Sequence, residues 1–373
     1  MMGEMALRYP HRSLVVSTGS YEGSAASDAR FPQVIDRVGI RATRLRTVQG
    51  LALWTWRAGA LARQWRPRFA WCAELKPAGY PARWLRARHR VPYGVIVHGT
   101  ELLLIQEKIR RSRFKRGTAG GIIGHAAVIV ANSNWTANLA LDILTELDVV
   151  VPVETVPLGT TPSRFRPGVD ASAVRAKYGL NVGGPWLLTV ARLEWHKGID
   201  TVIRAMAAVR AAHPTARYAV AGNGDRLAAF EQLRDELGLG DVVRFLGVVA
   251  EDDLPALYNA ADLYVGASRR VEGLVEGFGI SLVEAAASGL AVVGGRSGGV
   301  PEAVTHGETG ILVDPDDPAA VAAGINELLG NPERCKRLGA AGREAVESYY
   351  NWDRVAKDLM EIDRQYRSTP NSP

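Results

Sequence analysis

The sequence predicts an α/β protein made of two doubly wound domains, each with a parallel β-sheet covered by helices on both faces. Short apolar runs rich in Val, Ile and Leu recur along the chain, and stretches with helical spacing separate them. The runs are continuous rather than alternating with polar residues, which is typical of parallel strands buried on both faces. A segment dense in Pro and Gly, Val156 to Asp170, separates two halves that both show this pattern.

Six apolar runs predict strands, three in each half of the chain. They lie at 14–18 (L-V-V-S-T), 94–98 (G-V-I-V-H), 127–132 (A-V-I-V-A-N), 186–191 (W-L-L-T-V-A), 218–222 (Y-A-V-A-G) and 263–267 (L-Y-V-G-A). Helical spacing predicts helices at Ile199–His213 and Arg226–Leu237, and an amphipathic helix at Tyr349–Met360. We therefore divide the chain into an N-terminal domain, a C-terminal domain and a last segment with a helix and a disordered tail. These parts are residues 1–160, 161–345 and 346–373, and the tail is 368–373.

Positive charge is concentrated in the first third of the chain. Residues 1–120 hold 22 Lys and Arg against 7 Asp and Glu, a net charge of +15, so the remainder carries −9 within the overall +6. Five of the nine tryptophans also lie there, and Trp among Arg suits a membrane interface. The densest basic run, Glu107 to Arg116, predicts contact with an acidic membrane or, as readily, a solvated loop. No nucleic-acid-binding module is recognisable, so nucleic acid is not an expected partner.

Composition and targeting signals indicate a soluble cytoplasmic protein. Charged residues make up 23% of the chain and hydrophobic residues 47%, as in ordinary globular proteins. The N-terminus lacks the apolar core of a signal peptide, and no apolar run reaches the ~20 residues of a membrane span. Cys72 and Cys335 lie far apart and imply no disulfide, which fits a reducing compartment. We expect a cytoplasmic location, with peripheral attachment to the inner face of the cell membrane as an extension of it.

The stretch from Glu276 to Glu284, E-G-F-G-I-S-L-V-E, carries the strongest functional signal. Gly277 and Gly279 suit a turn that exposes backbone N–H groups, and a helical pattern begins at Ser281. A helix N-terminus offers unpaired N–H donors and partial positive charge to a phosphate. If the helix begins early, the eight-residue spacing puts both carboxylates on roughly one side of it. Two carboxylates beside an anion site fit a nucleotide sugar. Without the neighbouring motifs, however, two glutamates at this spacing more often belong to a solvated helix-capping segment.

The motifs around this stretch, in their order and spacing, resemble the C-terminal half of retaining glycosyltransferases of family 4, which have the GT-B fold. The resemblance runs from about Val128 to Glu347. It rests on Leu188–Gly198 (L-T-V-A-R-L-E-W-H-K-G), Ala219–Asp225 (A-V-A-G-N-G-D), Val243–Val249 (V-R-F-L-G-V-V), Ser297–Glu302 (S-G-G-V-P-E) and His306–Pro315 (H-G-E-T-G-I-L-V-D-P). It implies two Rossmann-like domains that face a cleft, with the last helix returning to the N-domain.

The same resemblance implies a catalytic set of His98, Arg192, Lys197 and Glu276. Arg192 and Lys197 follow a predicted strand and would clamp the diphosphate and stabilise it as the leaving group. Glu276 would accept a hydrogen bond from a donor-sugar hydroxyl. His98, which opens H-G-T-E at a strand end, would hydrogen-bond the donor sugar rather than act as a nucleophile. Taken alone, these residues would be surface charges and a structural histidine.

The residues implied in nucleotide-sugar binding lie on three loops. Glu284 would bind the ribose hydroxyls, Val248 and Val249 would meet the base, and Ile280 would pack near the ribose or the sugar. The N–H groups of the turn before the predicted helix would face the phosphates. The complete set is Gly222, Val248, Val249, Gly277, Phe278, Gly279, Ile280 and Glu284, with Ser133, Arg269 and Arg270 as weaker candidates.

The donor and acceptor follow from the finer resemblance. The stretch V-E-G-F-G-I-S-L-V-E with R-R-V-E-G-L before it looks most like mannosyltransferases that act on phosphatidylinositol lipids. This favours GDP-mannose as the donor, with UDP-sugars next, and a lipid or glycan hydroxyl as the acceptor. Retention without a nucleophilic carboxylate implies front-face attack assisted by the leaving diphosphate.

Two motifs suggest cofactors that we do not expect. Asp314-Pro315-Asp316 looks like a metal-binding D-x-D, but its position between G-I-L-V and P-A-A-V-A-A-G favours a turn and a helix cap. We therefore predict no essential metal. G-N-G-D at Gly222 to Asp225 is half of a dinucleotide fingerprint, but a third Gly and the later acidic residue are absent, so NAD is not expected.

The start of the chain departs from the family pattern. L-V-V-S-T-G-S-Y-E-G looks like the family's second strand and loop, so the N-domain is expected to lack its first strand-loop-helix unit, with Gly19 and Gly23 as poorly spaced substitutes. An alternative function is therefore a non-catalytic protein that binds a nucleotide sugar or a membrane. A third is a nucleotide-sugar epimerase, whose catalytic carboxylates would have to be Asp28, Asp36 or Glu74.

Overall fold

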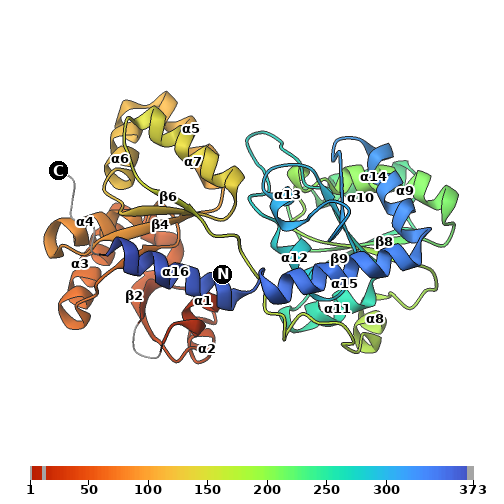
Figure 1. Cartoon of the computed structure of the whole chain (residues 1–373), viewed down its shortest axis with the longest axis horizontal. Coiled ribbons are helices and arrows are strands. Elements are labelled where there is room, and N and C mark those ends of the chain that lie inside the picture. Colours follow the sequence, from red (N-terminus) through yellow and green to blue (C-terminus); the bar gives the residue numbers. More distant parts are fainter. Residues whose placement is uncertain (1, 11–13, 368–373) are drawn as a thin grey trace. The chain divides into compact units, whose positions relative to one another are not determined.

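The computed structural model of the chain describes residues 2–10 and 14–367, so the tail predicted at 368–373 lies outside the described residues. The chain forms two compact units, each with its own sheets (Figure 1). Unit 1 holds the described residues up to Val156 together with those from Trp352 onward, and unit 2 runs from Pro157 to Asn351. Unit 2 therefore interrupts the sequence of unit 1.

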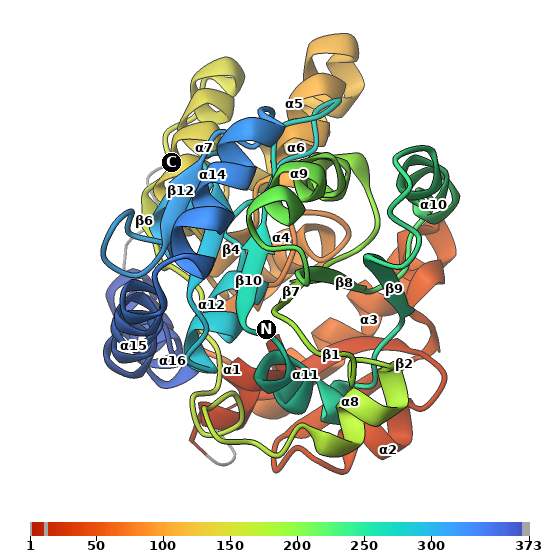
Figure 2. The ribbon, with the colours of Figure 1, turned by 90° about the vertical axis from the view of Figure 1, so that its right-hand side faces the viewer.

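Unit 2 is built on a six-stranded sheet in which all neighbouring strands are parallel. Their order is β12-β11-β10-β7-β8-β9, and Figure 2 shows β10, β7, β8 and β9 side by side. Numbered from β7, this is the order 3-2-1-4-5-6 of dinucleotide-binding domains read from the other edge. The strands are β7 Trp186–Val190, β8 Arg217–Ala221, β9 Val243–Gly247, β10 Leu263–Gly266, β11 Val292–Gly295 and β12 Ile311–Val313.

Helices cover both faces of the unit 2 sheet, as continuous apolar strands require. A large buried core lies between one face and helices α9, α10 and α14. On the other face α12 contacts β10 and β11 and packs against α15. The helices are α8 Ser172–Tyr178, α9 Ile199–Ala212, α10 Leu227–Glu236, α11 Leu254–Ala260, α12 Ile280–Ala287, α13 Val300–Ala303, α14 Pro318–Leu329 and α15 Pro332–Ser348, with short 3₁₀ turns η2 Trp195–Lys197 and η3 Glu251–Asp253.

Unit 1 contains two separate parallel sheets among the described residues rather than one. The four-stranded sheet has the order β3-β4-β5-β6, and β1 pairs with β2 alone. The strands are β1 Val15–Ser20, β2 Val34–Arg41, β3 Ala70–Cys72, β4 Tyr93–Val97, β5 Val128–Ala131 and β6 Val153–Thr155. The helices are α1 Met2–Arg8, α2 Ser24–Asp28, α3 Val48–Trp65, α4 Gly79–His89, α5 Thr100–Arg111, α6 Arg113–Ile123, α7 Asn134–Leu147 and α16 Trp352–Tyr366, with the 3₁₀ turn η1 Ala42–Arg46.

The last helix, α16, packs within unit 1 against α1, from the opposite end of the sequence (Figure 1). Its apolar face is buried, and Asp353 pairs with Arg8 of α1 at 2.6 Å. Near its end Tyr366 donates a hydrogen bond to Glu154 at 2.7 Å. Just before α16 the returning chain runs beside the outgoing one, because Thr160 N donates to Tyr350 O at 2.9 Å and Thr160 pairs with Asn351. The first and last residues of unit 2 are therefore held together.

The α/β prediction with parallel sheets is confirmed, and all six predicted strands are present within one or two residues. The predicted helices correspond to α9, α10 and α16. Cys72 and Cys335 are both free. Within the described ranges, none of the helices combines the length and apolar character needed to cross a bilayer.

Candidate active site

The carboxyl ends of β7 and β10 mark the point where the strand order of unit 2 reverses. β7 is the first strand of the sheet in sequence, with β8 on one side and β10 on the other. In open parallel sheets ligands bind at such a point, outside the carboxyl ends of the strands. The loop after β7 carries Arg192 and Lys197, and the loop after β10 carries Glu276. The fold thus brings three of the predicted residues to one edge of one sheet.

Lys197 and Glu276 are in direct contact there. The Lys197 Nζ atom lies 2.6 Å from Glu276 Oε2, and the side chains are only 17% and 20% exposed. Gly198, next to Lys197, has a φ of +66°, and a Cβ there would lie 1.8 Å from the Ala267 carbonyl oxygen just after β10. Glycine at 198 is therefore what lets the two loops approach closely enough for this ion pair.

Arg192 belongs to a second pair on the same loop. Its guanidinium Nη1 lies 2.9 Å from Glu194 Oε1, and its side chain is 73% exposed. The other Glu194 oxygen lies 3.2 Å from the Nδ1 atom of the buried His196. Burial, with the nearby Lys197 charge, lowers the pKa of His196, so its ring is neutral at pH 7. Both cations at this edge are thus held by carboxylates, and an anionic ligand would have to compete with those carboxylates.

The loop with Glu276 is fixed by its backbone, and the helix begins after it. Helix α12 starts at Ile280 behind Gly279, whose φ is +101°. The early helix start that would put Glu276 and Glu284 on one side of a helix is therefore not present, because Glu276 lies in the preceding loop. Gly299 N donates to the Glu276 carbonyl at 2.9 Å, and a Cβ at Gly298 would lie 2.2 Å from the same oxygen. The S-G-G motif thus holds the Glu276 loop in place.

Glu284, on α12, is half-buried and contacts α11. Tyr258 of α11 donates a hydrogen bond to Glu284 Oε2 at 2.8 Å. Burial raises the pKa of Glu284 to about 7, despite the opposing effects of the Tyr258 hydrogen bond and the Arg164 charge. A carboxyl group that is half protonated near neutral pH can accept or donate a hydrogen bond, and a ligand with two hydroxyls would favour the ionised form.

Two further loops approach the same edge from β8 and β9. Gly222 has a φ of +135°, and a Cβ there would lie 1.9 Å from the Ala191 carbonyl oxygen, so only glycine fits. Its N–H donates to Gly247 O at 2.8 Å. Just beyond, Val248 is 76% exposed and Val249 is half-buried. An apolar side chain exposed at a ligand edge is free to contact a flat ring such as a nucleotide base.

Phe278 and Ile280 differ in what they offer to a ligand. Phe278 is 1% exposed, and its ring centre lies 6.0 Å from that of Tyr350. Tyr350 in turn donates to Glu302 O on α13 at 2.6 Å. The Phe278 side chain is therefore part of the core, and only its backbone could meet a phosphate. Ile280, at the start of α12, is half-buried.

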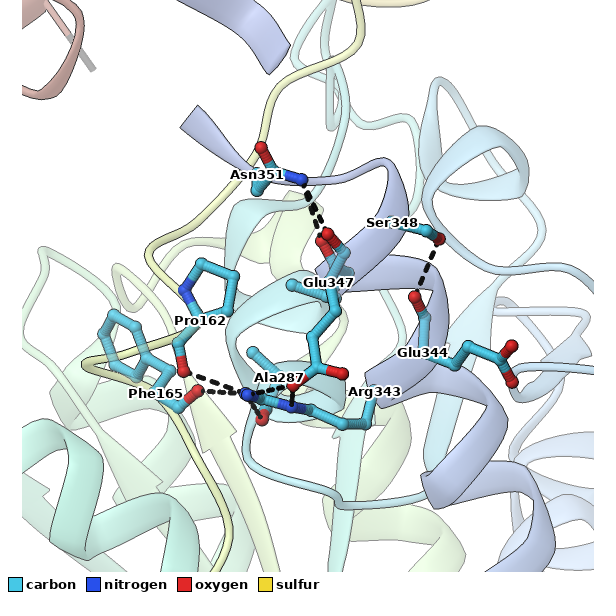
Figure 3. Close-up of polar contacts among 9 residues, drawn as sticks. Pro162, Phe165, Ala287, Arg343, Glu344, Glu347, Ser348 and Asn351 are labelled. Carbon is cyan, nitrogen blue, oxygen red and sulfur yellow. Dashed lines mark hydrogen bonds and ion pairs between the residues drawn. The ribbon is translucent and has the colours of Figure 1, made fainter. Parts of the chain in front are cut away.

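Arg343 of α15 contacts the carboxyl end of α12 (Figure 3). Its Nη1 lies 2.6 Å from the Ala287 carbonyl oxygen at the end of α12, and 2.9 and 2.7 Å from those of Pro162 and Phe165. Glu347 neutralises the same guanidinium at 2.5 Å. A cation at the carboxyl end of a helix is favourable to the helix dipole. Arg343 thus ties α12, which carries Glu284, to the segment that follows the start of unit 2.

In unit 1, His98 lies at the carboxyl end of β4, as predicted for a ligand edge. Its backbone N–H bonds to the Glu101 carboxylate, and Asn132 Nδ2 donates to its carbonyl at 3.4 Å. Burial lowers the pKa of His98, against the Glu101 charge and a hydrogen bond to the Ala73 backbone. The ring is thus neutral at pH 7 and suited to hydrogen bonding.

The weaker candidates have structural partners. Ser133 caps α7 by accepting from Thr136 N at 3.1 Å. Arg269 pairs with Asp200 at 2.7 Å and bonds to Thr201, which anchors the start of α9. Arg270 is exposed.

The acidic residues considered for other chemistries are also engaged. Asp316 N bonds to Asp314 Oδ1 at 3.0 Å, which confirms the turn, but the residue that caps α14 is Asp317. In the parts of the chain that the structure describes, no group of three or more His, Cys, Asp or Glu side chains is placed to bind a metal ion. The three carboxylates that an epimerase would need pair with arginines: Asp28 with Arg37, Asp36 with Arg57 and Glu74 with Arg46.

Sequence reasoning missed Glu194, His196 and Tyr258, which position the predicted residues. Glu194 and His196 stand inside the L-E-W-H-K-G motif, and that motif was the only signal for them. Tyr258 lies 26 residues before Glu284, and its contact depends on how α11 packs against α12. A local sequence pattern does not predict such a contact.

Comparison with known proteins finds similarity to glycosyltransferases. Residues 170–345 match the family model described as Glycosyl transferases group 1. The chain is 38% identical over 215 residues to the GDP-mannose-dependent alpha-(1-6)-phosphatidylinositol monomannoside mannosyltransferase of Mycobacterium tuberculosis, covering 57% of this chain and 56% of that protein. It is 33% identical over 256 residues to a D-inositol 3-phosphate glycosyltransferase of Acidothermus cellulolyticus, covering 65% and 55%. The matched region thus spans little more than half of these relatives.

Solved structures show the same fold over nearly the whole chain. Anabaena HepE in complex with UDP-glucose aligns with a TM-score of 0.79 and 18% identity, covering 98% of this chain and 95% of HepE. Sucrose-phosphate synthase from Thermosynechococcus elongatus aligns with a TM-score of 0.72 and 26% identity, covering 90% and 83%.

Proposed function

Because residues 170–345 are a group 1 glycosyltransferase domain in a chain of GT-B fold, we propose that this protein transfers mannose from GDP-mannose to a hydroxyl of a lipid or glycan acceptor. The observation that carries the proposal is the Lys197–Glu276 contact at the switch point of the unit 2 sheet. This contact supports the proposal because a cation that would bind a diphosphate lies beside a carboxylate that would bind a sugar hydroxyl. The names of the mannosyltransferase relatives favour GDP-mannose, and the UDP-glucose bound to HepE makes UDP-sugars the competing donors.

We also propose which domain binds the donor and which binds the acceptor. The C-terminal domain, 161–345, would hold the donor, and the N-terminal domain, 1–160, the acceptor. Glu284 would bind the ribose, and Val248 and Val249 the base. Gly222 and the N–H groups of Gly277, Phe278 and Gly279 would line the phosphates, and Ile280 the ribose or sugar. For His98 we retain a hydrogen bond to a hydroxyl of the donor sugar.

The proposed reaction retains the configuration of the transferred sugar and uses no metal. The acceptor oxygen attacks the anomeric carbon from the side of the diphosphate, and the bond to the phosphate oxygen breaks. The leaving diphosphate takes the acceptor proton, while Arg192 and Lys197 stabilise its growing negative charge. Glu276, which the proposal assigns to a sugar hydroxyl, is paired with Lys197 at 2.6 Å. We propose a cytoplasmic location with peripheral contact to the inner face of the membrane.

Nucleotide release tests this function directly. GDP-mannose, UDP-glucose and other donors are incubated with the protein and with phosphatidylinositol-containing vesicles, with and without EDTA, and the released nucleotide is measured. We expect release of GDP from GDP-mannose above the other donors, and equally with EDTA. Release of UDP instead would change the donor, and a metal requirement would bring Asp314 and Asp316 back as ligands. If no donor releases nucleotide but GDP still binds, the protein is a non-catalytic nucleotide-sugar-binding protein.

A further inference from the structure

Tyr258 of α11 is fully buried in unit 2 and packs against two other aromatic rings. Its ring centre lies 5.7 Å from that of Phe165, in an edge-to-face arrangement, and 5.9 Å from that of Tyr264 on β10. Aromatic pairs at these separations attract one another beyond their burial. Because the ring is enclosed in this way, the Tyr258 hydroxyl is held in one position.

The helix that carries Tyr258 is fastened to the segment at the start of unit 2. Asn259, the next residue on α11, donates from its Nδ2 atom to Arg166 O at 3.0 Å, and its Oδ1 accepts a backbone N–H from the same segment. The carbonyl of Phe165 in this segment is bound by Arg343 at 2.7 Å. The same Arg343 contacts the carboxyl end of α12. One connected set of contacts therefore fixes α11 relative to α12.

The Tyr258 hydroxyl favours the ionised form of Glu284, to which it donates at 2.8 Å. Burial and the Glu284 charge raise the pKa of Tyr258 well above its ordinary value, so the hydroxyl keeps its proton and acts as the donor. A hydrogen bond to the charged form of a group favours that form, whereas burial favours the neutral form. Tyr258 thus opposes the effect of burial, which raises the pKa of Glu284 to about 7.

The other ionisable groups around Glu284 have partners of their own. On the surrounding elements these groups are Arg164, Glu251, Tyr264, Glu302 and Arg343. Arg164 donates to the Glu251 carbonyl at 2.6 Å, and the Tyr264 hydroxyl donates to a β7 carbonyl at 3.3 Å. Within the described residues, the hydrogen bond that reaches the Glu284 carboxylate comes from Tyr258.

We propose that Tyr258 is a positioning residue for the ribose, because its hydroxyl holds the Glu284 carboxylate in the ionised form that accepts hydrogen bonds from the two ribose hydroxyls. That Glu284 binds the ribose rests on the proposed function. An ionised carboxylate accepts hydrogen bonds and donates none, so it favours a ligand with two hydroxyls over one without them. Tyr258 thereby sets the pH range in which the protein distinguishes a ribonucleotide from a nucleotide that lacks these hydroxyls.

Calorimetric titration of the full chain tests this role without requiring turnover. The probes are GDP, or UDP if it binds more tightly, and the dideoxy counterpart of the same nucleotide, which lacks both ribose hydroxyls. Both members of a pair carry the same base and phosphates, so the ratio of their affinities at each pH reports the ribose hydroxyls. In the wild type we expect this ratio to rise with pH through about 7, as Glu284 ionises, and to reach about tenfold.

Tyr258→Phe keeps the ring and removes the hydroxyl. The midpoint of the rise should move up by about one pH unit, because the ionised form of Glu284 loses a hydrogen bond, and the ratio should recover at higher pH. Glu284→Gln should give a small ratio at every pH. The matched control is Tyr218→Phe, which removes another buried tyrosine hydroxyl of unit 2, 2.8 Å from Thr189 Oγ1, and should keep the wild-type midpoint. Circular dichroism confirms that each variant is folded.

The outcomes separate this role from the proposed function. A flat ratio in the wild type, an unchanged midpoint in Tyr258→Phe, a ratio that stays low at every pH in that variant, or an equal shift in Tyr218→Phe overturns the role of Tyr258. If the wild type binds neither GDP nor UDP, the proposed function and this role both fail. A shifted midpoint in a protein that transfers no sugar would contradict the proposed function and leave the role of Tyr258 standing.

Discussion

At the scale of single residues, the Lys197–Glu276 pair is the feature most open to test. Lys197→Ala should leave the fold intact and lower kcat, because a leaving-group cation acts mainly in the transition state, where its loss costs about 2–4 kcal/mol of barrier. Steady-state kinetics measure the loss. Lys177→Ala is the matched control, since Lys177 is an exposed lysine of the same unit paired with Asp253. Activity of Lys197→Ala close to that of the control would show that Lys197 is a surface residue.

Glu284 predicts a pH dependence of stability. Its folded pKa, about 7, lies above the ordinary value of 4.5, so the folded protein binds a proton that the unfolded chain has already released. The stabilisation is complete below pH 4.5 and is lost as pH rises through about 7, with an amplitude on the order of 3 kcal/mol. Glu284→Gln should remove this loss between pH 5 and pH 8, as measured by thermal melting of both proteins. Parallel melting curves across that range would contradict the assignment.

At the scale of elements, Arg343 connects α15 to the end of α12. Arg343→Lys cannot serve three carbonyl oxygens and Glu347 at once, and each buried acceptor left unpaired costs about 1–3 kcal/mol. We expect a lower midpoint in urea and weaker binding of GDP, because α12 carries Glu284. Arg337→Lys, an exposed position on the same helix, is the control. Equal midpoints for the two variants would show that Arg343 does not support α12.

The elements were largely predictable from sequence, and the contacts between them were not. The apolar runs that became β7, β8 and β10 are typical of strands in a buried parallel sheet. The Lys197–Glu276 contact joins residues 79 apart and depends on β10 lying beside β7, which no local pattern states. α12 begins at Ile280, within one residue of the predicted Ser281, and the left-handed Gly279 before it leaves Glu276 outside the helix. The Asp314–Asp316 motif was predicted to cap α14, but Asp314 accepts a hydrogen bond from Asp316 N within the turn, and Asp317 is the residue that caps the helix.

At the scale of the whole molecule, the basic first third predicts salt-dependent membrane contact. Arg113 and Arg116 on α6 have no ion pair within the described residues, and Phe114 between them is 80% exposed. Each cation near an acidic surface contributes about 1 kcal/mol, screened over ~8 Å at physiological ionic strength. Replacing Arg113 and Arg116 with Gln should reduce sedimentation with acidic vesicles, and rising salt should do the same to the wild type.

Two arginines on α5 serve as the control for this prediction. Arg110 and Arg111 are neutralised by Glu146 and Glu107, so replacing them with Gln should matter less. Sedimentation that is indifferent to salt, or that depends equally on both pairs of arginines, would speak against a membrane surface and favour a soluble acceptor.

The return of α16 to unit 1 has a consequence for biosynthesis. A ribosome completes the first segment of unit 1 at Val156, then makes 157–351 before the helix that covers this segment emerges. At roughly 5–20 residues per second, that interval lasts on the order of ten to forty seconds. During this time the surface that will receive Val355, Leu359 and Ile362 has no cover, while unit 2, with both ends joined at Thr160 and Asn351, can fold as soon as it is released. Nascent unit 1 therefore exposes this apolar surface until α16 has been made, and a truncation before Trp352 would leave the surface exposed permanently.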